Sequence, residues 1–300
     1  MNKLIPLALL FLFAACSNDD DNFDELVNEL APETALLTSQ PPGNARQVYN
    51  DIINRIAADD GPSVAFAVDH GENAQMAGLS LRPARVVYFG NPDVGTRMMQ
   101  QNRLVGLDLP LRMMVYEDER ERATVTYRNA TFLTRTYDLD LPEQEDVVND
   151  LLAELAGRED ADPFLNISYD YADDIITRES NLSFSDAVKA AQQRVGDLDL
   201  TLVRSFDHAM NARGVDMELQ PTTLLVFGNA TAGTQLMDER IEVGYDLPLK
   251  MLIWQEGETT FVSYTNASTL AERYGLVNRT AAVGELNDAL LQVQRAALGE

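Results

Sequence analysis

Two histidines stand at matching places in the sequence, each directly after an aspartate and three residues before an Asn-Ala pair. They are His70, in VDHGENA, and His208, in SFDHAMNA, and the chain holds no other histidine. Imidazole and carboxylate groups are usual partners in acid–base chemistry. Adjacent residues of a strand point to opposite faces, however, so an Asp-His dipeptide does not by itself make a catalytic dyad. The alternative is structural: each ring bonds to backbone and orders the turn that follows.

A glycine-bounded loop is the second feature with possible chemistry. It reads FGNPDVGT from Phe89 and FGNATAGT from Phe227, between an apolar run and a helical segment. The glycine spacing resembles a phosphate-binding loop, but the lysine that defines such loops is missing from both copies. Free N–H groups at the helix start could still receive a small anion. Alternatively, the glycines permit a tight turn that Asn91 or Asn229 caps.

The third feature is a pair of opposite charges beside an apolar run, LDLPLR in one place and LDLPLK in another. Each pair could be a structural ion pair at the entry to a strand. We hypothesise instead that the three features meet in two equivalent pockets, one for each copy, that bind a small ligand. The candidate residues of the first pocket are His70, Asn91, Thr96, Asp108 and Arg112. Those of the second pocket are His208, Asn229, Thr234, Asp246 and Lys250.

The composition narrows the possible partners. The chain has 48 acidic and 23 basic residues and a formal net charge of −25. A surface of this sign repels phosphate backbones, so we expect no nucleic-acid partner. One cysteine and two histidines cannot supply a disulfide framework or a cysteine-based metal cluster. No calcium loop, G-x-S-x-G, H-E-x-x-H or dinucleotide motif is present, so no motif implies a metal, a cofactor or a known class of enzyme.

The first sixteen residues, MNKLIPLALLFLFAAC, are predicted to be a lipoprotein signal peptide. A lysine precedes an apolar run that is too short to span a bilayer comfortably. Small residues before Cys16 resemble a bacterial lipobox, which implies cleavage before Cys16 and attachment of diacylglycerol to its sulfur. Residues 17–33 would form an acidic tether, with Ser17 favouring the outer membrane over the inner one. An ordinary secretory signal with an incidental cysteine is the alternative.

The rest of the chain is an internal repeat. At an offset of 138 residues, 19 of the 48 positions in Asp69–Tyr116 are identical to those in Asp207–Trp254, without a gap. Later the offset becomes 137, so that VTYRNATFLTRTY aligns with VSYTNASTLAERY. Two copies of this length are each the size of a domain, so we expect a tandem duplication. The predicted domains are residues 34–158 and 174–300, with a linker at 159–173.

Each copy mixes helical and strand-like segments. Apolar residues at helical spacing predict helices at residues 44–57 and 185–195. Longer amphipathic helices are predicted at 143–156 and 284–298. Their inward residues would be Val147, Leu151, Leu152 and Leu155 in the first copy and Leu286, Leu290 and Val293 in the second. Two adjacent strands joined by an acidic or Gly-containing turn predict a hairpin in each copy. The fold class is therefore α+β, with two-layer domains.

The shared elements, DH…NA, FGN…GT and DLPL[RK], resemble the family called domain of unknown function 302 (DUF302), over nearly all of the chain after the tether. The resemblance implies compact α+β domains related to the TATA-binding-protein-like fold, packed here as a pseudo-twofold pair, and it brings no established activity. We expect a non-catalytic envelope lipoprotein that binds a small ligand or an envelope protein. The alternatives are an enzyme that uses the His, Asn, Asp and Lys side chains for acid–base chemistry, and a structural scaffold.

Overall fold

A computed structural model describes residues 36–59, 61–157, 162–163 and 174–300. The predicted signal peptide, Cys16, the tether and most of the linker lie outside the described residues. Within the described part of the chain, no helix is both long and apolar enough to cross a membrane.

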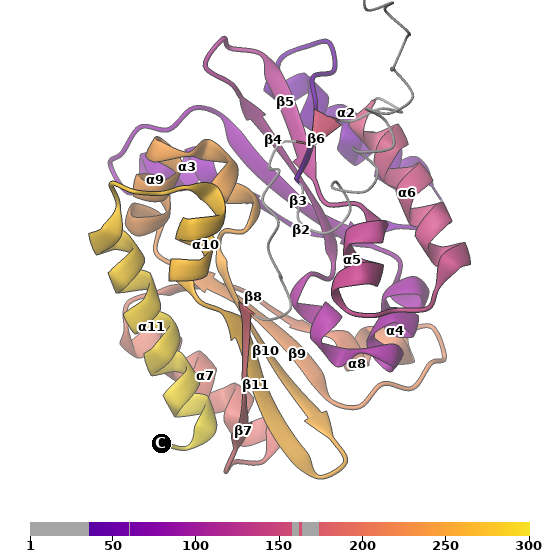
Figure 1. Cartoon of the computed structure of the whole chain (residues 1–300), viewed down its shortest axis with the longest axis vertical. Coiled ribbons are helices and arrows are strands. Elements are labelled where there is room, and N and C mark those ends of the chain that lie inside the picture. The colour runs from indigo at the N-terminus through magenta and orange to yellow at the C-terminus, as the bar shows by residue number, and fades with distance from the viewer. Residues whose placement is uncertain (1–35, 60, 158–161, 164–173) are drawn as a thin grey trace, which may run out of the picture.

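Each copy forms an antiparallel sheet whose five strands follow the same order (Figure 1). The first sheet has the order β2-β3-β4-β5-β1, with the short β6 (Asp162–Pro163) paired to β1, and the second has the order β8-β9-β10-β11-β7. The strands of the first sheet are β1 (Leu37–Ser39), β2 (Ser63–Asp69), β3 (Ala84–Gly90), β4 (Leu111–Glu117) and β5 (Ala123–Tyr127). Those of the second are β7 (Ile175–Ser180), β8 (Thr201–Asp207), β9 (Thr222–Gly228), β10 (Leu249–Glu256) and β11 (Thr259–Thr265). The α+β class and the tandem duplication are thereby confirmed.

One face of each sheet is covered by helices of its own copy. In the first domain these are α2 (Ala45–Ala58), α4 (Pro92–Gln101), α5 (Ala130–Thr136) and α6 (Pro142–Ala156). In the second they are α7 (Phe184–Asp197), α9 (Ala230–Glu239), α10 (Ala267–Tyr274) and α11 (Thr280–Leu298). Helix α2 begins with a capping box of Asn44 and Gln47, and Val48, Ile52 and Ile56 bury one of its faces. Apolar residues at helical spacing therefore produce the predicted two-layer packing.

The inward face of α6 differs from the prediction by part of a turn. Val148, Leu152, Leu155 and Ala156 are buried, whereas the side chain of Val147 is 64% exposed. In the doublets Val147-Val148 and Leu151-Leu152, either residue could belong to the apolar face of the helix. In the structure the second residue of each doublet is buried. In α11 the expected Leu286, Leu290 and Val293 are all buried.

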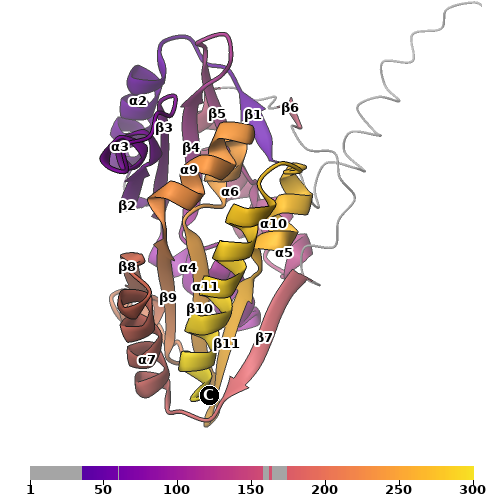
Figure 2. The same cartoon turned by 90° about the vertical axis from the view of Figure 1, so that its left-hand side faces the viewer.

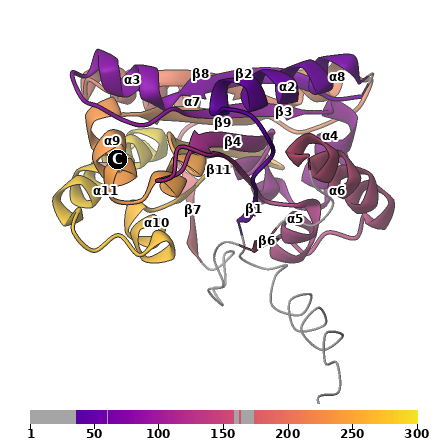
Figure 3. The same ribbon diagram turned by 90° about the horizontal axis from the view of Figure 1, so that it is seen from above.

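The other face of each sheet is covered by the other copy. The 3-10 turn η1 (Arg103–Leu107) of the first copy packs on the second sheet, where Leu107 meets Leu224, Val226 and Leu252. The matching turn η3 (Ile241–Tyr245) packs on β3, β4 and β5 of the first sheet. Figure 2 shows α9 of the second copy beside the first sheet, and in Figure 3 the α10–α11 and α5–α6 pairs lie on opposite sides. Each domain thus gives the other the same element, as expected for a pseudo-twofold pair.

A glycine in each 3-10 turn permits this exchange. A Cβ atom on Gly106 would lie 3.1 Å from Cδ1 of Leu252, in β10. A Cβ atom on Gly244 would lie 3.0 Å from Cε of Met114, in β4, and 2.5 Å from Cε of Met237. The Val-Gly pair that recurs in both copies therefore marks the place where each turn approaches the opposite sheet.

Candidate functional site

The two aspartates before the histidines act as helix caps. Asp69 precedes α3 (His70–Met76), and its Oδ1 accepts a hydrogen bond of 2.9 Å from the amide of Glu72. Asp207 precedes α8 (His208–Arg213), and its Oδ1 accepts from the amide of Met210 at 2.8 Å. A carboxylate in this position satisfies a free amide of the first helical turn. The Asp-His dipeptide is therefore a strand end followed by a capped helix start, not a catalytic dyad.

Each histidine is buried against the opposite domain. Nε2 of His70 donates to the carbonyl oxygen of Gly244, 3.0 Å away in η3. Burial lowers the pKa of His70 to about 4, although the Gly244 carbonyl favours the protonated ring. Burial likewise lowers the pKa of His208 to about 4. The carbonyl of Gly106 in η1 acts against this shift, because it favours the protonated ring. The rings bond or lie close to backbone, as the structural alternative predicted, but this backbone comes from the partner copy and not from the following turn.

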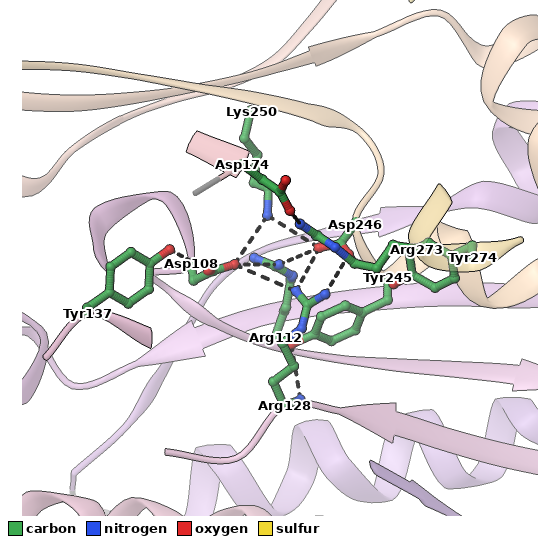
Figure 4. Close-up of polar contacts among 10 residues, drawn as sticks. All are labelled: Asp108, Arg112, Arg128, Tyr137, Asp174, Tyr245, Asp246, Lys250, Arg273 and Tyr274. Atoms are coloured by element: carbon green, nitrogen blue, oxygen red, sulfur yellow. Dashed lines mark hydrogen bonds and ion pairs between the residues drawn. The ribbon is translucent and has the colours of Figure 1, made fainter. Parts of the chain in front are cut away.

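The charged residues of the two DLPL segments lie together instead of in separate pockets. We call Asp108, Arg112, Asp246 and Lys250, with Arg128, the central cluster (Figure 4). Arg112 binds Oδ1 of Asp108 and Oδ1 of Asp246, each at 2.8 Å. Lys250 Nζ lies 3.6 Å from Asp108 and 3.7 Å from Asp246. The predicted ion pairs within each copy are present, and both copies contribute them to one buried network.

Several residues of this network were not among the candidates predicted from the sequence. Arg128 binds both carboxylate oxygens of Asp246, at 2.9 and 2.8 Å. The hydroxyl of Tyr274 donates to Asp246 at 2.9 Å, and that of Tyr137 donates to Asp108 at 2.7 Å. The two tyrosines are equivalent in the repeat at its later offset of 137, which is a signal that could have identified them. Arg128 has no such signal, because the second copy has a threonine in its place.

Burial and charge act in opposite directions on the central cluster. Burial alone would raise the pKa of Asp108, but Lys250, Arg112 and Arg128 outweigh it and hold that pKa well below its usual range. The pKa of Asp246 is also held well below its usual range, because Arg128, Arg112 and Lys250 together outweigh its burial. Burial lowers the pKa of Lys250 to about 7. Arg112 lowers it further, whereas the carboxylates of Asp108 and Asp246 act to raise it. Charges that are buried and paired in this way are costly to separate, and here the pairs join residues of the two domains.

Two clefts open between the domains, and each takes its polar residues from both copies. The first cleft, of about 830 Å³, brings His70 together with Asn229 and Thr234. The second cleft, of about 500 Å³, brings His208 together with Asn91 and Thr96.

The predicted pocket membership is therefore wrong. Each histidine shares a cleft with the Asn and Thr of the other copy, and the charged residues of the central cluster line neither cleft. The cause is the exchange of η1 and η3, which sets each Asp-His turn against the opposite domain. Among the described residues, no group of three or more His, Cys, Asp and Glu side chains could hold a metal ion.

The glycine-bounded loops form capped helix starts within these clefts. Oδ1 of Asn91 accepts from the amide of Asp93 at 2.9 Å, and Oδ1 of Asn229 accepts from the amide of Ala232 at 3.1 Å. The hydroxyl of Thr96 donates to the carbonyl of Pro92 at 2.6 Å. The capping alternative is confirmed. The loops do not resemble phosphate cradles, because an asparagine side chain already accepts a hydrogen bond from an amide of the first helical turn in each.

Residues 38–160 and 176–293 match the family described as "Domain of unknown function DUF302". The chain belongs to the DUF302 family. A solved DUF302 structure, "Crystal structure of uncharacterized conserved protein DUF302 from Bacillus stearothermophilus", is 14% identical with a TM-score of 0.38, covering 41% of this chain and 98% of that one. The described part of this chain thus holds two DUF302 domains in tandem.

Curated relatives share a shorter region. "Fluoride-specific ion channel FluC 1" of Brucella suis biovar 1 (strain 1330) is 38% identical over 100 residues, which is 32% of this chain and 39% of that protein. "Fluoride-specific ion channel FluC 1" of Brucella abortus and "Fluoride-specific ion channel FluC 2" of Brucella melitensis are each 38% identical over 100 residues, which is 37% of their length. The match therefore spans less than half of each of these relatives.

Proposed function

We propose that this chain is a non-catalytic module that binds small molecules in the two clefts between its DUF302 domains. One observation carries the proposal: each cleft is built from a histidine of one domain and an asparagine and a threonine of the other. Concave sites at domain boundaries, apolar in part and with a few convergent polar groups, are where small ligands usually bind.

The distribution of titratable groups favours binding over catalysis. Acid–base chemistry by the predicted residues would require a histidine and a carboxylate or lysine at one substrate. Asp108, Asp246 and Lys250 are instead paired with one another and with arginines in the central cluster. His70 is held by the Gly244 carbonyl. The arrangement supports a recognition role for the clefts and a structural role for the cluster.

Two equivalent glycines provide the test. Gly95 lines the second cleft and Gly233 the first, each within a helix. A Cβ atom at Gly95 would have its nearest neighbour at 3.6 Å, and one at Gly233 at 3.7 Å, which are ordinary contacts. Gly95→Leu and Gly233→Leu should each fill one cleft while leaving the helix intact, because leucine favours helices more than glycine does.

The measurement is native mass spectrometry of the full chain purified from the cells that produce it, with thermal unfolding in the presence of the recovered molecules. A bound small molecule should appear on the wild-type protein and be lost from one of the two variants. Its addition should raise the melting temperature, since a ligand that binds only the native state stabilises it. Binding to neither cleft, with no mass lost from either variant, would contradict the proposal.

We further propose that a lipid on Cys16 attaches the protein to the bacterial envelope, on the outer membrane. The lipobox-like segment before the only cysteine supports this proposal. Membrane fractions should contain the wild-type protein with a diacylglycerol-modified amino terminus, whereas Cys16→Ala should lack the lipid. A wild-type protein with an unmodified cysteine after maturation would contradict it.

A further inference from the structure

The second cleft has a mainly aliphatic lining. Helices α4 and α6 of the first domain and strand β8 with α8 of the second surround it, and these helices lie close together in Figure 1. Its apolar residues include Val94, Met98, Leu109, Val147, Leu151 and Phe206. The outward turn of Val147 leaves an apolar side chain exposed at this cleft. A concavity with a largely apolar lining, one residue of which is exposed, indicates a site for an apolar group.

The charges that line the second cleft are mostly negative. Three exposed carboxylates, Asp59, Asp150 and Glu154, face a single exposed cation, Arg204. No ion pair joins any of the four to another described residue. In the first cleft, by contrast, Arg85 forms an ion pair of 2.6 Å with Asp69. The second cleft therefore keeps an uncompensated negative charge around an apolar interior, which favours a positively charged ligand.

His208 brings a buried imidazole ring to the second cleft. Its side chain lines this cleft and is only 3% exposed, and the Gly106 carbonyl of η1 contacts the ring from the other domain. A neutral imidazole keeps one nitrogen as an acceptor. Phe206 lies edge-on to this ring, with 5.0 Å between the ring centroids. An imidazole and an aromatic ring in a cleft that is also lined by carboxylates suit an ammonium group.

We propose that the second cleft binds an amphipathic amine, with its apolar chain among the aliphatic side chains of α4 and α6 and its ammonium group toward the carboxylates and His208. This inference rests on the proposed binding function and names the ligand class for one of the two clefts.

The test compares three probes with the same apolar chain: dodecylamine, dodecanol and dodecanoate. Isothermal titration of the full chain at pH 7, below the micellar concentration of each probe, measures the affinities. Dodecylamine should bind most tightly and dodecanoate most weakly, with about tenfold between them, or 1.4 kcal/mol. Gly95→Leu should abolish binding, and the matched Gly233→Leu should leave it unchanged.

A charge reversal tests the role of the carboxylates. Asp150→Lys with Glu154→Lys changes two exposed side chains of α6, so the fold should persist. The affinity for dodecylamine should fall about tenfold and that for dodecanoate should rise, because opposite charges now face each head group. Asp288→Lys is the control, since this exposed residue of α11 is equivalent to Asp150 but lies outside both clefts.

The outcomes separate this inference from the proposed function. Equal or tighter binding of dodecanoate, or amine binding that survives Gly95→Leu, would overturn the amine class while leaving small-molecule binding in place. If none of the three probes binds and a co-purified molecule of another class is still displaced by Gly95→Leu, the amine inference fails alone. If neither glycine variant loses any bound molecule, both fail.

Discussion

Nε2 of His70 lies 3.0 Å from the carbonyl oxygen of Gly244, so the residue that begins α3 in the first domain bonds to η3 in the second. The glycine permits the approach, because a side chain at Gly244 would collide with methionines of both domains. Since a carbonyl oxygen only accepts, Nε2 carries a proton, and a pKa of about 4 leaves the ring neutral at pH 7. His208 and Gly106 are the equivalent pair. The histidine and glycine that recur in the repeat are two sides of one interdomain contact.

The burial of the two histidines predicts that the stability of the folded chain depends on acid. The pKa of both histidines is lowered to about 4 in the folded chain and would be near 6.5 when unfolded. Their contribution is present above pH 6.5 and is lost as the pH falls toward 4, because the unfolded chain binds more protons there. Urea unfolding should show lower stability at pH 5 than at pH 7. Each ring should lower the free energy of unfolding by about 1.4 kcal/mol for every pH unit below 6.5.

The control for the acid dependence is the double variant His70→Gln, His208→Gln. It should be less stable than the wild type at pH 7 but nearly independent of pH between 6.5 and 5. An unchanged pH slope in this variant would assign the effect to other groups.

Gly244→Ala should destabilise the interface between the domains. The added Cβ would lie 2.5 Å from Cε of Met237 and 3.0 Å from Cε of Met114, so both methionines must move. Overpacking of this kind costs about 1–3 kcal/mol. Gly284→Ala in α11 is the matched control, because nothing lies within 4 Å of its Cβ position. That substitution should be neutral or stabilise the chain by up to about 1 kcal/mol in denaturant unfolding.

Asp246→Asn should be among the most destabilising single changes in the chain. Asp246 accepts from Arg112, Arg128 and Tyr274, and removing its charge deprives the buried Arg128 of the carboxylate that it binds through both oxygens. A buried cation left without its partner costs about 3–5 kcal/mol. Asp93→Asn removes an exposed carboxylate from an ion pair with Arg97 and should change stability little. If calorimetry shows that Asp246→Asn and Asp93→Asn lose similar amounts of stability, the central cluster is not the stabilising network we describe.

Lys250 predicts a second pH dependence, on the alkaline side. Its pKa is lowered to about 7 in the folded chain and is about 10.5 in an unfolded one. Between these values the unfolded chain binds more protons, so the stability should rise as the pH increases from 7 toward 10. Lys250→Met should remove this rise in urea titrations at pH 7, 8 and 9. A rise of the same size in the variant would contradict the assignment.

The sequence predicted the elements of the fold better than their partners. Apolar periodicity located the helices and strands, and Asn91 and Asn229 were recognised as possible caps. The repeat offset showed that His70 and His208 are equivalent, but equivalence does not tell which copy a side chain contacts. The exchange of η1 and η3 depends on the packing of two whole sheets, which no local pattern encodes. Val147 was misplaced for a related reason, since only the sheet decides between two adjacent valines.

The exchange of η1 and η3 between the domains also affects how the two clefts can diverge in evolution. A substitution in one copy alters only that copy's side of a cleft, so each cleft can be modified from either domain independently. Two separate identical subunits packed in this way would have two identical clefts. Fusion of the copies into one chain lets the halves diverge, as Arg85 in one copy and Thr223 in the other illustrate. The duplication has thus produced an internal heterodimer whose two sites can acquire different specificities.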